Sequence, residues 1–292
     1  MNHPLKIWLL AIRPKTLSLA VTPVLVGTAL AWAEQRAFAW GPLLAALGAA
    51  LLIQAGTNLH NDAADFERGA DGPDRLGPRR VTAEGWLSPA RVRMGAHLSF
   101  AAALLLGAYL VRVGGWPILL LGLVSLAAGY AYTGGPKPIA YTPLGELFVL
   151  LFFGIAAVAG SSYLQTYSVS AHALLAGGAV GLIAAAVLLV NNYRDLETDR
   201  RAGKHTLAVT LGRPSVRLLY ALLLLLPFAL ILPLHRLTGD ALWLTGLALP
   251  MALWLIRMLW RAPIDTGLNR LLARTAQLQL LFGLLLGLAL IG

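Results

Sequence analysis

Nine apolar stretches, each long enough to cross a lipid bilayer, dominate this sequence of 292 residues. A bilayer core about 30 Å thick needs roughly 20 apolar residues in one helix. The stretch LLYALLLLLPFALILPL is apolar on every face rather than alternating with period 2, which favours helices over a membrane β-barrel. We therefore predict an all-α polytopic membrane protein with nine transmembrane helices in one bundle. The predicted spans are residues 16–33, 41–58, 94–111, 116–133, 144–165, 171–191, 218–234, 241–256 and 271–291.

The composition agrees with a membrane protein and limits its metal chemistry. Hydrophobic residues make up 58% of the chain and charged residues 12%, against about 25% charged residues in soluble domains. Because no polar stretch is large enough for a second domain, residues 1–292 are predicted to form a single integral-membrane domain. The chain has no cysteine, so any metal must have oxygen or imidazole ligands.

The basic residues are distributed unevenly along the chain. If the nine stretches span the membrane, 20 of the 23 Lys and Arg residues fall on the side of the N-terminus, and the exceptions are Arg36, Arg112 and Arg236. The positive-inside rule then predicts a cytoplasmic N-terminus and an external C-terminus in the cell (inner) membrane. The net charge of +10 therefore indicates the lipid bilayer, not nucleic acid, as the partner.

The N-terminal segment permits two further readings. A cleaved signal peptide ending near ALAWA is the rival to a first span, but the apolar run is longer than a usual signal core and cleavage would remove Arg13 and Lys15. Arg13 and Lys15 either set the topology or contact an anionic substrate. The sequence leaves this choice open.

Two polar clusters follow apolar spans on the predicted cytoplasmic side. Residues 58–71 read NLHNDAADFERGAD and residues 191–206 read NNYRDLETDRRAGKHT. In each cluster an Asn precedes an Asp by four residues (58 and 62, 191 and 195), so each pair lies on one face of a helix that continues past its span. The recurrence after four predicted helices suggests a duplicated four-helix unit followed by one added helix.

The clusters have the composition of two half-sites for divalent cations. Carboxylates at a membrane boundary are costly unless paired, hydrated or coordinated, and solvated helix-end charges are the alternative reading. Mg²⁺ is typically held by one or two carboxylates together with substrate phosphates. Arg68, Arg194 and Lys204 lie close to the acids in sequence, as expected where metals and side chains share the charge of a polyanion. The implied ligand is a diphosphate with a hydrophobic remainder, such as an isoprenyl diphosphate.

These clusters resemble the paired aspartate-rich motifs of the UbiA-type intramembrane prenyltransferases, and the resemblance covers essentially the whole chain. Within that family, the sequence is most similar to the branch that prenylates 1,4-dihydroxy-2-naphthoate in menaquinone synthesis. The similar segments are IRPKTLSLAVTPVLVGTA, TNLHNDAADFERGAD, YTGGPKPIAYTPLGE and NNYRDLETDRRAGKHTLAVTLG. The resemblance implies about nine helices, Mg²⁺ as cofactor, and a polyprenyl diphosphate and a small aromatic acid as substrates.

The resemblance also implies roles for individual residues. The metal ligands would be Asp62, Asp65, Asp71, Asp195 and Asp199. The catalytic residues would be Asp62, Asp195, Lys137 and Tyr132. The substrate-binding residues would be Asn58, Asn192, Arg194, Lys204, Arg68 and Lys15.

The sequence departs from the family pattern at two positions. The pattern NDxxDxxxD would place its last acid at position 69, which is Gly69 here, so Asp71 is the nearest replacement. The second motif begins with Asn191 where many relatives have Asp. Whether Asp71 contacts metal, and whether Asn191 or Asn192 does, stays open.

The loop that joins the fourth and fifth predicted spans contains one cation, Lys137. The resemblance places Lys137 on the diphosphate and Tyr132 near the reacting carbon. The alternative is a lysine that extends its stem along apolar surface to reach water. Glu146 is either a charge at a helix N-terminus or a partner of another site residue.

The resemblance implies that the reaction is transfer of a polyprenyl chain from its diphosphate to the naphthoate with loss of CO₂, which gives demethylmenaquinol. Other acceptors, such as 4-hydroxybenzoate, and a phytyl donor are alternatives within the same enzyme class. A cation-coupled transporter is a third hypothesis, but transporters place their ions near the midplane at broken helices, whereas these acids lie at one membrane face. A structural or assembly factor would not need two metal-type motifs.

Overall fold

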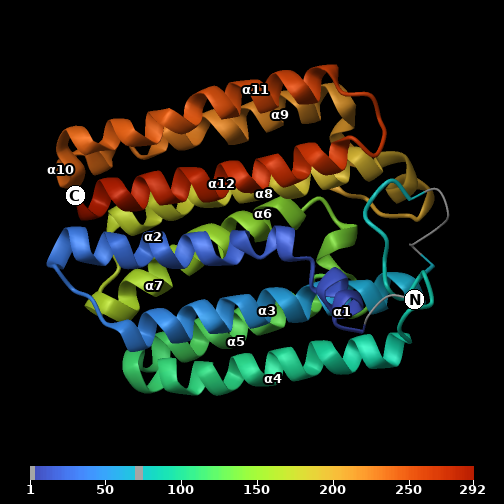
Figure 1. Cartoon of the computed structure of the whole chain (residues 1–292), viewed down its shortest axis with the longest axis horizontal. Coiled ribbons are helices and arrows are strands. Elements are labelled where there is room, and N and C mark those ends of the chain that lie inside the picture. The colour runs from blue at the N-terminus through green and yellow to red at the C-terminus, as the bar shows by residue number, and fades with distance from the viewer. Residues whose placement is uncertain (1–3, 70–74) are drawn as a thin grey trace.

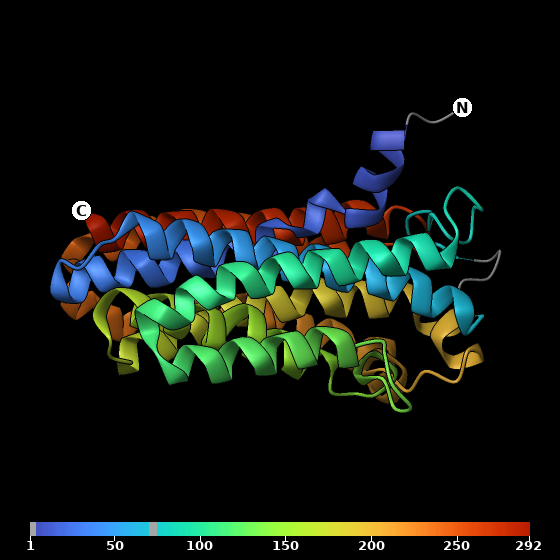
Figure 2. The ribbon, with the colours of Figure 1, turned by 90° about the horizontal axis from the view of Figure 1, so that it is seen from below.

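The computed structural model describes residues 4–69 and 75–292, and every regular element in these residues is a helix (Figure 1). Long helices run along a common direction and form one elongated bundle, as the two views at right angles show (Figure 1 and Figure 2). The all-α prediction is therefore confirmed.

The first part of the chain forms five α-helices. Their bounds and that of one short 3₁₀ turn are α1 (Pro4–Ile12), η1 (Pro14–Thr16), α2 (Ser18–Gln35), α3 (Trp40–Glu67), α4 (Pro89–Gly114) and α5 (Trp116–Ala131). Arg13 has a left-handed backbone conformation with φ 58°, and the α1–η1 segment is bent by 49° from α2. The N-terminal segment therefore turns away from the bundle axis instead of continuing α2.

The second part of the chain packs around one central helix. Its elements are η2 (Ile139–Tyr141), α6 (Gly145–Leu150), η3 (Leu151–Ala156), α7 (Ala157–Thr166), α8 (Ala171–Arg201), α9 (Leu207–Leu230), η4 (Leu232–Leu234), α10 (His235–Thr238), η5 (Gly239–Ala248), α11 (Leu249–Arg261) and α12 (Leu268–Ile291). The α8 helix packs against α6, η3, α9 and α12. Gly154 in η3 lies against the backbone of Gly177 and Gly181 in α8, since small residues let membrane helices approach closely.

The long apolar helices make this chain a multi-pass membrane protein. In the described residues, six helical stretches are long and apolar enough to cross a membrane, or seven if α1–η1 and α2 count as one bent span. The α5 helix, with 16 residues, is too short to be counted, and Leu207–Arg261 counts as one stretch of 55 residues although it contains both α9 and α11. The exact number of nine spans and the duplication stay predictions.

Two helices carry the polar clusters past their apolar parts. The predicted spans 41–58 and 171–191 continue as helix to Glu67 in α3 and to Arg201 in α8. Both helices end at the same end of the bundle as α1, and the C-terminal end of α12 lies at the opposite end (Figure 1). The fold therefore brings the two clusters to one end of the molecule.

Candidate functional site

A cavity of about 1140 Å³ opens between the polar ends of α3 and α8 and continues into the bundle. Its polar part is lined by the Asn and Asp residues of both clusters and by cationic side chains. Its apolar part is lined by α3, α4, α5 and the α6–η3 segment, including Phe148, Phe152 and Phe153. One space therefore has a charged chamber at one end and an apolar section at the other.

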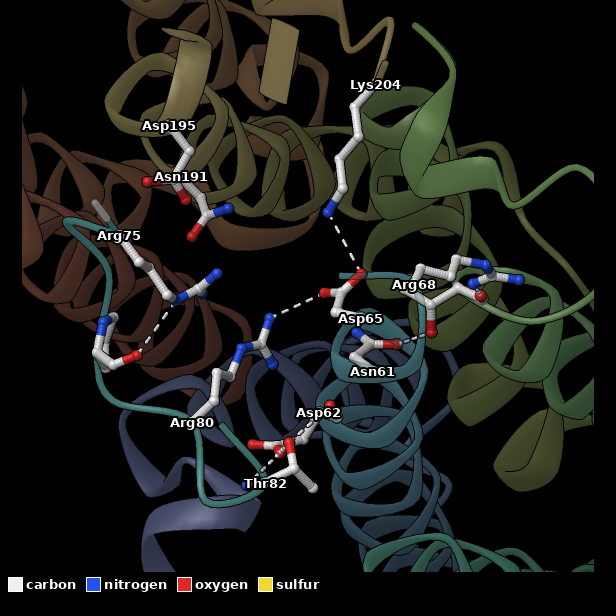
Figure 3. A network of polar contacts seen from close by, with 12 residues as sticks. Asn61, Asp62, Asp65, Arg68, Arg75, Arg80, Thr82, Asn191, Asp195 and Lys204 are labelled. Carbon is white, nitrogen blue, oxygen red and sulfur yellow. Dashed lines mark hydrogen bonds and ion pairs between the residues drawn. The ribbon is translucent and has the colours of Figure 1, made fainter. Parts of the chain in front are cut away.

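The first cluster presents Asn61 and Asp65 to this cavity. The Asp65 carboxylate is buried and has three side-chain partners: Arg80 Nη2 at 3.1 Å, Lys204 Nζ at 3.3 Å and the Tyr141 hydroxyl at 3.2 Å. Figure 3 shows Arg80 and Lys204 reaching Asp65 from different directions. Asp65 therefore connects three segments that are far apart in the sequence.

Asp62 has a different environment from Asp65. Its carboxylate accepts hydrogen bonds from the backbone N–H of Val81 at 3.3 Å, and from the backbone N–H and hydroxyl of Thr82 at 3.1 and 2.5 Å. Asp62 is not among the residues that line the cavity, and Figure 3 shows it turned toward Thr82. The expected metal-facing position of Asp62 is therefore not what the structure shows, because this carboxylate holds the loop that follows α3.

The helical geometry of α3 explains this difference. Residues advance by about 100° around a helix axis, so Asn61 and Asp65 are rotated by about 60° from Asn58 and Asp62. Asn58 still lines the cavity, and its Nδ2 donates to the carbonyl of Ile12 at 2.7 Å. Both pairs have the same spacing, and the pair at 61 and 65 is the one that has its carboxylate in the cavity.

The second cluster presents Asn191, Asp195 and Asp199, spaced by four residues, to the same cavity. Arg194, which is 2% exposed, donates from Nε at 2.8 Å and from Nη2 at 2.5 Å to the two oxygens of Asp195. Its Nη1 donates to Asn269 Oδ1 at 2.6 Å, and its Nη2 also donates to Asn191 Oδ1 at 2.8 Å. A two-point arginine–carboxylate pair fixes geometry as well as charge, so Arg194 orients Asp195.

Asn191 and Asn192 both line the cavity, so the structure does not choose one over the other. The Asn192 side-chain Nδ2 donates to Glu146 Oε1 at 2.9 Å, and both residues are buried. The sequence allowed Glu146 to be either a charge at a helix N-terminus or a partner of another site residue. The structure shows it as the partner of Asn192. Its carboxylate fixes the position of the Asn192 amide.

Two tyrosines lie beside the acids. The Tyr141 hydroxyl donates to Asp65 Oδ1 at 3.2 Å, and burial and then the Asp65 charge raise the pKa of Tyr141 above its ordinary value. Tyr132 lines the cavity, so it presents an aromatic ring and a hydroxyl to the acidic chamber.

The remaining predicted residues divide into two groups. Lys15 and Lys204 line the cavity. Arg68 does not: it donates to the carbonyl oxygens of Thr133 and, at 2.8 Å, Gly135. Arg68 therefore supports the loop between α5 and α6.

Lys137 lies on that same loop and is exposed to solvent. It is outside the cavity lining. Asp71 lies outside the described residues, so the structure says nothing of its position.

Several cavity residues were not identified from the sequence. They are Asn61, Arg75, Arg80 and Asn269; the Asp65 partner Tyr141, which is outside the lining, was not identified either. For Asn61 a signal existed, since it precedes Asp65 by the same four residues that separate Asn58 from Asp62. For the others no local pattern exists, because their contacts join segments that are distant in sequence; Asn269 Nδ2, for example, donates to the carbonyl of Leu76 at 2.9 Å.

The donor atoms of the chamber fit a hard divalent cation. Within residues 4–69 and 75–292, no three His, Cys, Asp or Glu side chains converge into a preformed cage. Instead, Asn61 and Asp65 face the cavity from α3, and Asn191, Asp195 and Asp199 face it from α8. Mg²⁺ is commonly bound by one or two carboxylates and completes its shell with substrate phosphates and water, which is what two such half-sites provide.

Comparison with known proteins identifies related sequences and folds. The family described as UbiA prenyltransferase family matches residues 20–288. The chain is 38% identical to 1,4-dihydroxy-2-naphthoate octaprenyltransferase of Escherichia coli (strain K12), over 95% of this chain and 92% of that protein. It is 33% identical to the Bacillus subtilis (strain 168) protein of the same name, over 96% of this chain and 90% of that protein.

Solved structures of low sequence identity share the fold. A UbiA homolog from Aeropyrum pernix K1 superimposes with a TM-score of 0.71 at 16% identity, covering 96% of this chain and 98% of that one. A UbiA homolog from Archaeoglobus fulgidus, bound to DMAPP and Mg²⁺, gives a TM-score of 0.68 at 17% identity, covering 97% and 98%.

Proposed function

Because this chain belongs to the UbiA prenyltransferase family, we propose that it transfers a polyprenyl chain from polyprenyl diphosphate to 1,4-dihydroxy-2-naphthoate. The carboxyl group leaves as CO₂, and the product is demethylmenaquinol. The observation that carries this proposal is the single cavity that joins the two acidic clusters to an apolar section. Relatives that cover nearly the whole chain bear the name of this activity.

The proposed cofactor is Mg²⁺. Its ligands would come from Asn61, Asp65, Asn191, Asp195 and Asp199, which all line the cavity. When bound, the metal supplies positive charge that stabilises the diphosphate as it leaves. A UbiA homolog with the same fold is bound to DMAPP and Mg²⁺, which supports this choice of metal.

The cationic side chains of the chamber would bind the diphosphate. Arg80 and Lys204 line the cavity and already lie beside Asp65. As the bond between the allylic carbon and oxygen breaks, its electron pair stays on the diphosphate, so negative charge grows on the bridging oxygen. Fixed cations near that oxygen stabilise the transition state more than the ground state.

Ionisation of the donor leaves an allylic cation beside Tyr132. An aromatic face attracts a cation, and Tyr132 lines the cavity in which the cation would form. The electron-rich ring of the acceptor then forms a bond to the allylic carbon. Loss of CO₂ returns the electrons of the broken carbon–carbon bond to the ring.

The position of the chamber suggests an orientation in the membrane. Both acidic clusters lie at the bundle end that also has α1, and 20 of the 23 basic residues belong to the predicted loops on that side. The proposed active site therefore opens toward the cytoplasm from a multi-pass protein of the cell (inner) membrane.

Product analysis tests the proposed function. Purified protein would receive Mg²⁺, a mixture of prenyl diphosphates, and equal amounts of 1,4-dihydroxy-2-naphthoate and 4-hydroxybenzoate, and the lipid products would be measured by mass spectrometry. We expect a prenylated naphthoquinol that has lost CO₂. A product formed only from 4-hydroxybenzoate would contradict the acceptor, and no prenylated product from either acid would contradict the activity.

A further inference from the structure

A second cavity, of about 380 Å³, lies where α2 ends and α3 begins, at the end of the bundle opposite the acidic clusters (Figure 1). We name it the α2 groove, and its lining residues are Leu25, Thr28, Ala29, Trp32, Phe38, Leu43 and Ile291. The four residues of α2 have the spacing of one helix face and extend over about 10 Å at 1.5 Å per residue. None of the seven residues lines the large cavity, so the α2 groove has a lining of its own.

The α2 groove borders the lipid-facing surface of the bundle. Leu44 of α3 and Leu288 of α12 lie beside its lining residues Leu43 and Ile291 in the chain, and they are 60% and 54% exposed. Both helices are long and apolar enough to cross a membrane, so these exposed side chains face lipid tails. Because lipid tails are as apolar as leucine, an acyl chain is the occupant that fits the groove.

Exposed aromatic residues mark the headgroup level at this end of the bundle. They are Trp40, Trp116, Tyr167 and Trp243. Trp and Tyr are enriched at membrane–water interfaces, where one part of the ring is in apolar surroundings and the polar group reaches water. Trp40 packs edge-on against the groove residue Phe38, with ring centroids 4.8 Å apart. The Phe38 end of the α2 groove therefore lies at the depth of phospholipid headgroups.

An arginine without a carboxylate partner lies at this end of the groove. The guanidinium carbon of Arg36 is 5.3 Å from the ring centre of Trp32, which lines the groove. In the part of the chain that the structure describes, no Asp or Glu forms an ion pair with Arg36, and Glu34 pairs with His172 at 2.9 Å instead. The cation–π contact thus holds an unneutralised positive charge beside the groove. A phosphate group matches such a charge.

Topology and backbone conformation both disfavour an arginine at position 36. Arg36 is one of three basic residues on the predicted external side, where positive charge is scarce. Its φ of 53° is in the left-handed region, which Gly and Asn adopt more readily at helix C-termini. A cation does interact favourably with the dipole at the C-terminus of α2, and this local role is the alternative to lipid binding.

We propose that the α2 groove binds one acyl chain of an anionic phospholipid, whose phosphate is held by Arg36. A headgroup of negative net charge is preferred to a zwitterionic one, because no acid neutralises Arg36. The site lies at the opposite end of the molecule from the proposed active site, and its occupant is a membrane lipid, not a substrate. Since a ligand that binds only the folded protein stabilises it, the bound lipid raises the Tm.

Native mass spectrometry of the purified full-length protein in detergent tests the site. Phosphatidylglycerol and phosphatidylcholine with identical acyl chains would be titrated separately, and the Kd of the first bound lipid would be measured. We expect Arg36→Gln to raise the Kd for phosphatidylglycerol by about tenfold or more, because it removes hydrogen bonds to a charged group, and to leave phosphatidylcholine binding nearly unchanged. Ala29→Leu should weaken the binding of both lipids, because the larger side chain fills the groove.

Arg112→Gln and Ala101→Leu are the matched controls. Both residues are exposed on α4 and lie outside the groove lining, so both variants should keep the wild-type affinities. A wild-type Kd in Arg36→Gln, or a rise no larger than in Arg112→Gln, would overturn the proposal. A lower Tm of lipid-free Arg36→Gln with unchanged lipid affinity would also overturn it, since Arg36 would then only cap α2. If Ala29→Leu does not fold, the comparison of the two arginine variants still decides, because both changes are at the surface.

Discussion

The acidic clusters of α3 and α8 have the same four-residue spacing, but their carboxylates are held in different ways. Asp195 is oriented by Arg194, its neighbour in the chain. Asp65 is held instead by Arg80 from the loop after α3 and by Lys204 from the segment after α8. The second cluster is therefore built within one helix, whereas the first depends on two loops.

This difference indicates how charge is balanced in the chamber. A buried carboxylate is costly unless it is paired and hydrogen-bonded. The guanidinium of Arg194 both pairs with the Asp195 charge and donates hydrogen bonds to it. Removal of this guanidinium therefore leaves the Asp195 carboxylate with no comparable partner in the described structure. At Asp65 two cations share the charge, so the loss of one is partly compensated by the other.

The largest fall in activity is expected when Asp65 or Asp195 is changed, and not when Asp62 is changed. Asp65→Asn and Asp195→Asn should each lower kcat by roughly a thousandfold or more, because several kcal/mol of leaving-group stabilisation is lost. Removal of Mg²⁺ by a chelator should have the same effect, and added Mg²⁺ should restore activity. The measurement is steady-state turnover, with circular dichroism to confirm the fold.

Asp62→Asn is the matched variant one turn away on α3. It should retain much of the activity and instead destabilise the protein by about 1–3 kcal/mol, because Val81 and Thr82 lose hydrogen bonds to a carboxylate. A folded Asp62→Asn protein as inactive as Asp65→Asn would show that the cavity-facing pair of α3 has been assigned incorrectly.

Arg194→Gln should have the next largest effect. The variant loses the two-point contact with Asp195 and leaves a buried carboxylate without its charge partner, so we expect kcat to fall about a hundredfold, equivalent to about 2.7 kcal/mol. Arg194→Lys should recover only part of this loss, since lysine has no planar fork. The Mg²⁺ concentration for half-maximal rate tests whether Arg194 orients Asp195. This concentration should rise in the glutamine variant, and an unchanged value would argue against orientation of Asp195 by Arg194.

Arg80→Gln should have a smaller effect than Arg194→Gln. Lys204 still lies 3.3 Å from Asp65, so we expect kcat/KM for the prenyl diphosphate to fall by only about tenfold, or about 1.4 kcal/mol. The double variant Arg80→Gln with Lys204→Met should lose more than the sum of the two single changes in free energy, because the cations share one carboxylate. Additive losses would mean that the two cations act independently.

The smallest effect is expected at Lys137. The resemblance to the family places this lysine on the diphosphate, but its side chain is exposed and outside the cavity lining. Lys137→Met should therefore change kcat and KM by less than about threefold, in line with the 0.5 kcal/mol typical of surface substitutions. A large fall in kcat with little change in KM would show instead that the loop brings Lys137 to the donor during turnover.

The sequence by itself determined the class of the protein and the end of the bundle at which its candidate site lies. Apolarity is a property of each local segment, and the free energy of placing a segment in lipid is set largely by its own residues. The apolar stretches therefore identified a multi-pass α-helical protein, and the polar clusters after two of them identified the ends of α3 and α8 as the candidate site. The motifs also identified the family, which the relatives confirm.

Tertiary structure alone decided which side chains face the cavity. Both Asn58–Asp62 and Asn61–Asp65 have a four-residue spacing, and only the rotation of α3 against its neighbours separates them. The left-handed bend at Arg13 and the solvent-facing position of Lys137 likewise have no local signal. Helix rotation, and contacts such as Arg80 with Asp65 and Asn269 with Leu76, arise from packing between distant segments, which a local pattern of residues does not encode.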